Sequence, residues 1–163
     1  MTDDLALWSE FNVAMLGATA ALAGLVIVAM SVNIREIIAS RALTARLAAG
    51  IAALVLAIVA SGTALVPGIH PAAYGVVLIA AALFAGVFQV NASVAIFTDP
   101  EPAARARLAK SLLGFLPILA YLVGGSMAIG GAPGALAVTA AGALIAIVAA
   151  IIVAWVVLVE VLR

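Results

Sequence analysis

The segment REIIASRALTAR, residues 35–46, decides the fold, because it places three arginines between two long apolar runs. The chain has only seven Lys and Arg residues, and the others lie in a second such connection and at the C-terminus: Arg105, Arg107, Lys110 and Arg163. The alternate connections, PGIHP (67–71) and GGAPG (130–134), contain no Lys or Arg. This alternation is typical of a multi-span membrane protein, in which basic residues concentrate in the cytoplasmic loops.

Composition points the same way. Hydrophobic residues make up 68% of the 163 residues and charged residues only 9%, whereas soluble domains have about 25% charged residues. A nucleic-acid partner is not expected, because no basic stripe on a folded surface is indicated. The chain has no cysteine, which excludes disulfides, thiolate metal sites and thiol nucleophiles.

Five apolar segments are long enough to cross a hydrocarbon core of about 30 Å as helices. The sequence therefore predicts an all-α, polytopic membrane helix bundle that forms a single integral-membrane domain over residues 1–163. An odd number of spans puts the acidic N-terminus outside and Arg163 in the cytoplasm, and the localisation expected is a bacterial plasma membrane. The expected spans are residues 8–33, 46–66, 72–97, 108–129 and 135–162.

Several local features refine these spans. The fourth helix is expected to begin near residues 98–101, either with Asp99 as N-cap and Pro100 in the first turn, or with a capping box of Thr98 and Glu101. Pro117 inside this helix predicts a kink, because proline removes one helical hydrogen bond. Aromatic anchors at the two membrane interfaces are expected at three positions: Trp8, Tyr74 and Trp155.

The first apolar run is dense in small residues at four-residue spacing, namely Gly17 with Ala21 and Ala20 with Gly24. Such residues let helix backbones approach closely in lipid, where packing holds helices together. They indicate an oligomer contact, a pore-lining face, or packing within one bundle, which is the more ordinary use in an alanine-rich chain. We expect this helix to be the central one.

Three polar residues lie in the third span. Gln89 and Ser93 are four residues apart and share a helix face, whereas Asn91 points roughly the other way. Because unpaired amides are costly in hydrocarbon, both faces are expected to meet protein or water. The residues either line a polar vestibule on the cytoplasmic side or form interhelical hydrogen bonds that fix the packing register, and we favour the second interpretation.

The basic residues are expected to contact anionic headgroups of the inner leaflet. This prediction covers Arg35, Arg41, Arg46, Arg105, Arg107 and Lys110.

An enzyme, a metal site and a cofactor are not expected. The single histidine, His70, sits in a turn between two prolines, and the nearest serine, Ser61, is nine residues away across a helix end. Ser61 and Thr139 are expected to bond to carbonyls of their own helices.

Residues 11–26, FNVAMLGATAALAGLV, and 28–34, VAMSVNI, resemble the first helix of a family of small bacterial multi-span membrane proteins. Members are similar again at the end of the second helix, here LVPG at residues 65–68. Some carry the label of modulators of the membrane protease FtsH. The resemblance covers roughly the first seventy residues; it implies the fold class and no catalytic or binding residue.

Two functions remain open from the sequence. The first is a non-enzymatic membrane protein that acts through helix–helix contacts, as an accessory or regulatory subunit, with a second copy or another membrane protein as partner. The second is a small oligomeric channel or transporter, with Gln89, Asn91 and Ser93 lining a cavity on the cytoplasmic side.

Overall fold

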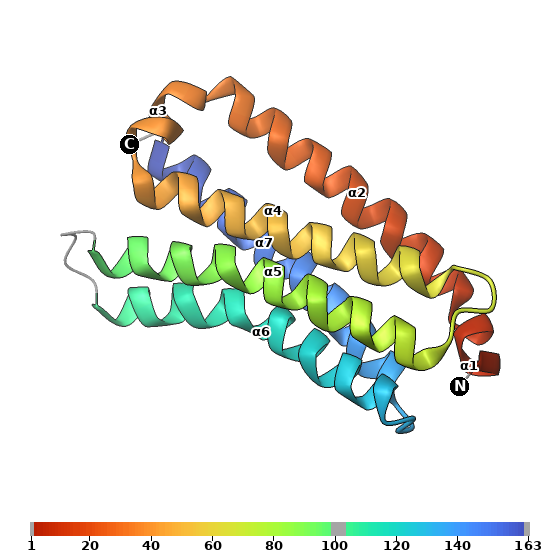
Figure 1. Cartoon of the computed structure of the whole chain (residues 1–163). Helices are drawn as coiled ribbons and strands as arrows, with labels where there is room; N and C mark the ends of the chain where they lie inside the picture. Colours follow the sequence, from red (N-terminus) through yellow and green to blue (C-terminus); the bar gives the residue numbers. More distant parts are fainter. Residues whose placement is uncertain (1, 99–103, 162–163) are drawn as a thin grey trace.

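The structure is a computed structural model that describes residues 2–98 and 104–161, with side chains described for residues 5–98 and 111–159. The described part is all-helical, as predicted. Five long helices run roughly along one axis, and two short ones lie near their ends (Figure 1). The long helices are α2 (Ser9–Val32), α4 (Arg41–Ala64), α5 (Pro71–Thr98), α6 (Ala104–Ile129) and α7 (Ala135–Val161), and the short ones are α1 (Thr2–Leu7) and α3 (Ile34–Ala39).

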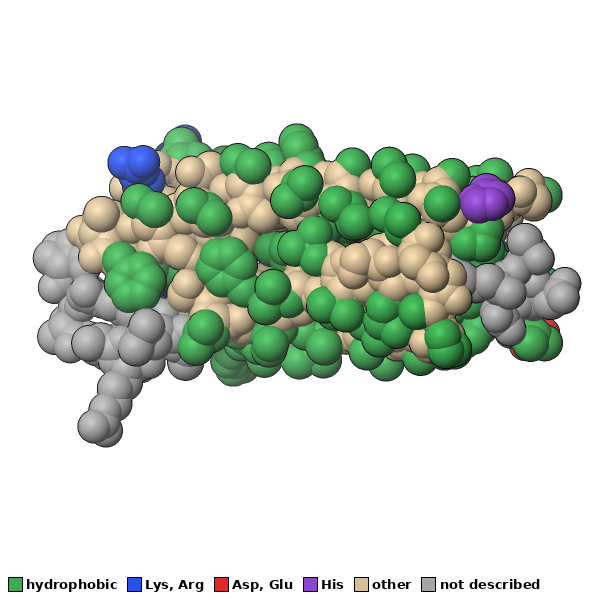
Figure 2. All heavy atoms as spheres, turned by 60° about the horizontal axis from the view of Figure 1, so that its bottom comes forward, with side chains coloured by type: hydrophobic (Ala, Val, Ile, Leu, Met, Phe, Trp, Pro, Cys, Tyr) green, Lys and Arg blue, Asp and Glu red, His purple; other side chains and the backbone are tan. Residues whose placement is uncertain are grey.

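All five long helices contain a stretch long and apolar enough to cross a membrane. The chain is therefore an integral membrane protein of the multi-pass class. Figure 2 shows hydrophobic side chains along the length of the visible face, with basic side chains at one end and His70 at the other. We call these the basic end, marked by Arg35 and Arg41, and the turn end, marked by the turns at residues 65–70 and 130–134.

The helix boundaries differ from the predicted spans mainly at the starts of α4 and α6, and α6 begins at Ala104 rather than at residue 108. Helix α4 starts at Arg41 rather than near residue 46, because the Ser40 side chain caps it by accepting a hydrogen bond from the Leu43 N–H at 3.3 Å. At the turn end, glycines with positive φ close both connections: Gly68 (69°), Gly131 (66°) and Gly134 (85°). The predicted caps at Asp99, Pro100 and Glu101 lie outside the described residues.

Helix α4 is central, and α2 is peripheral, so the expectation of a central first helix was wrong. Helix α4 packs against α2, α5 and α7 and touches α3 and α6, whereas α2 packs mainly on α4. In the most apolar stretch of each helix, 39% of the residues of α4 are buried, but only 22% of those of α2. The reason is that the buried surface of α4 consists largely of its own alanines, which let several helices approach it, while Gly17, Ala20, Ala21 and Gly24 of α2 are exposed.

Helices α4, α5, α6 and α7 enclose the core, and glycines set their closest approaches near the turn end. A Cβ at Gly75 of α5 would overlap the carbonyl oxygen of Gly125 of α6. A Cβ at Gly124 of α6 would lie 3.3 Å from the backbone nitrogen of Thr139 of α7. Small residues thus allow backbone-to-backbone packing, as helix association in lipid requires.

Two aromatic predictions have different outcomes. Trp155 is 68% exposed towards the basic end of α7, a position open to an interfacial anchor. Tyr74 is only 1% exposed and belongs to the main core cluster, so its prediction as an interfacial anchor was wrong. Its hydroxyl has a polar partner inside the bundle, which is why the side chain points inward.

Candidate functional site

The polar side chains of α5 bind α6 near the basic end. The Gln89 Nε2 donates to the backbone oxygen of Ser111 at 3.1 Å. The hydroxyls of Ser93 and Ser111 lie 2.7 Å apart, and Ser93 also donates to the Gln89 backbone oxygen at 2.9 Å. Gly114 makes room for this arrangement, since a Cβ there would overlap the Gln89 amide. These contacts are the interhelical hydrogen bonds that the spacing of Gln89 and Ser93 favoured.

The Asn91 side chain takes no part in the described hydrogen bonds between α5 and α6. Its side chain is exposed on the outer face of α5, beside Val87, Val90 and Val94, and it makes no hydrogen bond to any residue that the structure describes. Within the described residues of one chain this face meets no protein, and its contact with water or a second protein stays a prediction. An amide on this face would meet lipid or a second protein.

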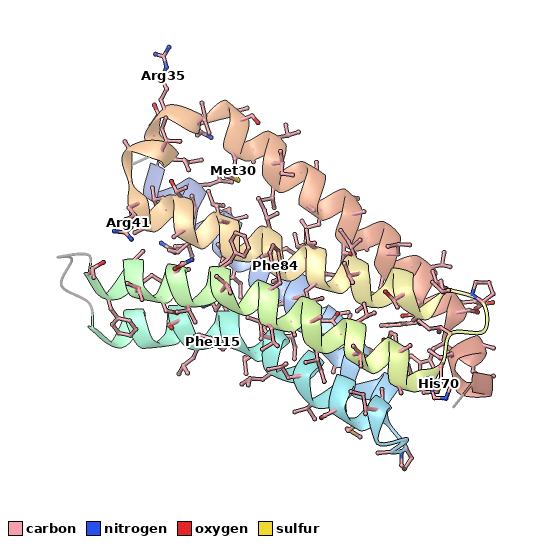
Figure 3. All side chains as sticks on the ribbon, in the orientation of Figure 1. Met30, Arg35, Arg41, His70, Phe84 and Phe115 are labelled. Atoms are coloured by element: carbon pink, nitrogen blue, oxygen red, sulfur yellow. The ribbon has the colours of Figure 1, made fainter. Side chains whose placement is uncertain are left out.

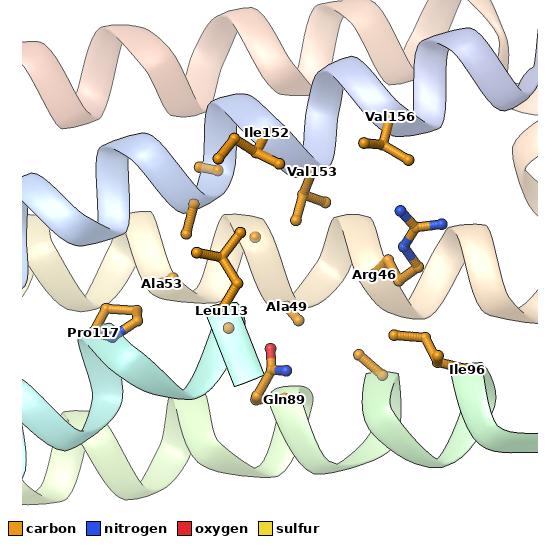
Figure 4. A pocket seen from close by; sticks show the side chains of 15 residues that line it. Arg46, Ala49, Ala53, Gln89, Ile96, Leu113, Pro117, Ile152, Val153 and Val156 are labelled. Atoms are coloured by element: carbon orange, nitrogen blue, oxygen red, sulfur yellow. The ribbon is translucent and has the colours of Figure 1, made fainter. Parts of the chain in front are cut away.

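A groove opens at the basic end between α6 and α7, with α4 as its floor (Figure 4). Its cavity volume is about 50 Å³. Fifteen residues of α4, α5, α6 and α7 line it, and only two of them, Arg46 and Gln89, are polar. Pro117, the predicted kink position, is buried in this lining, and the kink itself stays a prediction.

The basic residues divide into two kinds. Arg35 and Arg41 are exposed at the basic end, and Arg35 projects away from the bundle (Figure 3). Arg46 is only 7% exposed and lines the groove instead of the outer surface. The side chains of three further predicted headgroup contacts lie outside the described residues: Arg105, Arg107 and Lys110.

Sequence reasoning missed a second polar cluster, which lies near the turn end. It draws one side chain from each long helix: Asn12, Ser61, Tyr74, Tyr121 and Thr139. All five are at most 8% exposed, and they line a cavity of about 10 Å³. The available signal was that Tyr121 falls well inside a span, where tyrosine is less common than at interfaces.

The hydrogen bonds of this cluster are incomplete. The Thr139 hydroxyl donates to the Leu136 oxygen at 2.9 Å and is paired with the hydroxyl of Tyr74. Asn12 donates to the Trp8 oxygen at 3.0 Å. The fully buried hydroxyl of Tyr121 has no partner within the part of the chain described. Ser61, expected to bond its own helix, also makes no hydrogen bond to a described residue.

The small residues of α2 form a face that points away from the bundle. We call Gly17, Ala20, Ala21 and Gly24 the α2 outer face. All four are exposed, and a Cβ added at Gly17 or Gly24 would meet no atom within 4 Å. The residues that α2 buries lie on its opposite side: Asn12, Met15, Thr19, Ala23 and Val26. The α2 outer face therefore takes no part in packing within one chain.

No group of three His, Asp or Glu residues that could hold a metal occurs among the residues described. His70 has a local role, because its Nδ1 accepts a hydrogen bond from the Ala72 N–H at 3.2 Å. It is exposed at the turn end, whereas Ser61 is buried. The chain matches no protein-family model, no curated protein and no solved structure in the comparisons made.

Proposed function

We propose that this protein is a non-enzymatic integral membrane protein that acts through lateral helix contacts, and that it associates with a second copy of itself through the α2 outer face. The observation that carries the proposal is the orientation of α2. Met15, Thr19 and Val26 are among the residues that it buries, while the α2 outer face is exposed and a Cβ at either of its glycines would meet no atom within 4 Å.

Helix association within a lipid bilayer lacks a hydrophobic driving force. Acyl chains solvate a leucine as well as another helix does, so association depends on close backbone packing. A face with a small residue at four consecutive contact positions lets two helix axes approach until Cα–H groups meet carbonyl oxygens. Because the two copies present the same face, a two-fold symmetric contact satisfies both.

We further propose that the basic end faces the cytoplasm of a bacterial cell. The support is the position of Arg35 and Arg41 at this end, together with the uncharged turns at the other. Basic residues are retained on the cytoplasmic side during insertion. In this orientation the N-terminus is outside, and the α2 outer face, about 10 Å long, lies near the middle of the span.

Co-purification tests the association. Two differently tagged copies are co-expressed and extracted into native nanodiscs, and one tag is used to recover the other. We expect recovery for the unaltered protein and loss for the Gly17→Leu, Gly24→Leu double variant. Gly86→Leu is the matched control, because Gly86 lies in a span and also has open space around it. Equal recovery from all three proteins, or none from the unaltered protein, would contradict the proposal.

Transport is the second candidate, favoured by the position of Gln89 and Arg46 in the groove at the basic end. Flux through proteoliposomes across a panel of ions and solutes tests it. A flux that is lost in Gln89→Leu would support transport. The absence of flux for every solute would count against it.

A further inference from the structure

The groove at the basic end combines an apolar lining with the side chain of Arg46, which is buried. Its floor is made of small residues of α4, Ala49, Gly50 and Ala53. Gly50 leaves the floor without a side chain, and a Cβ added there would come into ordinary contact with Val153 of α7, at 3.7 Å. Aliphatic side chains of α6 and α7 form the walls. The lining therefore suits a hydrocarbon chain.

The charge lies where the groove approaches the membrane surface. Arg46 is five residues into α4, about 7.5 Å along the axis from its first residue, and Ala53 is about 10 Å deeper. Figure 4 shows the Arg46 guanidinium directed from α4 towards α7, at one end of the groove, with Ala53 and Pro117 towards the other. A cation near the membrane surface and an apolar floor deeper in the bilayer complement an anionic phospholipid, whose phosphate lies at the surface and whose acyl chains lie below it.

We propose that this groove binds one anionic phospholipid from the leaflet at the basic end, with the phosphate at Arg46 and one acyl chain on the α4 floor. A guanidinium can hold a phosphate through two parallel hydrogen bonds. Arg46 also has an interaction within the protein. The five N–H groups of arginine allow it to serve a second acceptor.

The bilayer itself is the source of this ligand. The groove lies within the spans, where lipid is the surrounding solvent, so the test asks which lipid it retains. A buried cation favours an anionic headgroup over a zwitterionic one, because the low local dielectric strengthens their attraction. No residue of α2 lines the groove, so lipid binding does not depend on self-association.

Native mass spectrometry of the detergent-solubilised protein tests the site, with phosphatidylglycerol and phosphatidylcholine of the same acyl chains as the probes. We expect the first bound equivalent to be phosphatidylglycerol, preferred by about tenfold, because both lipids offer the same phosphate to Arg46 but phosphatidylcholine also brings a cationic choline close to the guanidinium. Arg46→Gln should remove this preference. Arg41→Gln is the matched control, because Arg41 is exposed on the same helix, and it should keep the preference.

A second variant tests the groove with the charge left in place. Gly50→Leu raises the floor and should weaken retention of both lipids, whether or not Arg46→Gln can be purified. Three results would overturn the proposal: equal binding of the two lipids by the unaltered protein, an equal loss in the two arginine variants, or unchanged retention in Gly50→Leu.

Discussion

Gly75→Ala is the sharpest structural test, because it adds a single methyl group at the closest approach of α5 and α6. The added Cβ would overlap the Gly125 carbonyl oxygen and lie 2.7 Å from Ile129 Cγ1 and 3.1 Å from the Ile129 nitrogen. Two of these three atoms belong to the backbone of α6, so a side-chain rotation cannot relieve the overlap. The helices themselves must move apart.

The expected magnitude follows from two opposing effects. Overpacking costs about 1–3 kcal/mol, and replacing glycine by alanine inside a helix returns about 0.5–1 kcal/mol. We therefore expect Gly75→Ala to lower the free energy of unfolding by about 1–2 kcal/mol. At Gly86, where a Cβ meets nothing within 4 Å, the same substitution has only the favourable effect.

Unfolding by SDS in mixed micelles, followed by circular dichroism, measures this difference. The Gly75→Ala protein should unfold at a lower SDS fraction than the unaltered protein, and Gly86→Ala at an equal or higher one. If the two alanine variants were equally stable, the close packing of α5 on α6 at this position would be refuted.

Three further predictions concern the polar clusters and the orientation. Tyr121→Phe removes a buried hydroxyl without a described partner and should raise the free energy of unfolding by about 1 kcal/mol, measured by the same SDS assay. Tyr74→Phe should lower the free energy of unfolding. A lower stability of Tyr121→Phe would show that the Tyr121 hydroxyl is hydrogen-bonded. Gln89→Leu should lower stability by about 1 kcal/mol, and Asn91→Leu, which alters an exposed amide, should not; equal effects would contradict the assigned hydrogen bonds. Tags at the two termini of intact cells should be labelled from outside only at the N-terminus, and labelling of both or of the C-terminus alone would contradict the proposed orientation.

The span positions followed from the sequence because charge and apolar length are local properties. The predicted ends of the first, third and fifth spans lie within one residue of the helices observed. The start of α4 was placed too late because Arg46 was taken as a boundary. A single buried arginine near a helix end is tolerated when its long side chain finds polar atoms, and the sequence does not distinguish this case from a surface arginine.

Which helix lies at the centre of the bundle, and which face each helix buries, could not be predicted from charge and apolar length. In a soluble helix the buried face is the apolar one, but in lipid the outward face is apolar too. Val55 and Ala57 of α4 illustrate this, since the first is 41% exposed and the second fully buried. Hydrophobic periodicity therefore gave no reason to place α4 at the centre or to turn the α2 outer face away from the bundle.

The candidate polar sites were predicted in part. The spacing of Gln89 and Ser93 correctly placed them on one face. Their partner, Ser111, lies on the next helix, 18 residues after Ser93, and the sequence alone does not show which helices pack together. The five-helix cluster around Tyr121 was missed for the same reason. Each of its members is a single polar residue in a different span, and only the tertiary structure brings them together.

Disulfide crosslinking in native membranes tests the proposed self-association most directly, because the chain has no cysteine of its own. Single cysteines are placed along α2, and mild oxidation is followed by non-reducing electrophoresis. We predict crosslinked dimers for cysteines at Gly17, Ala21 and Gly24, and much weaker crosslinking at Ala18 and Leu25, which are exposed but lie to one side of this face. Uniform crosslinking at all five positions, or none at the first three, would contradict a contact through the α2 outer face.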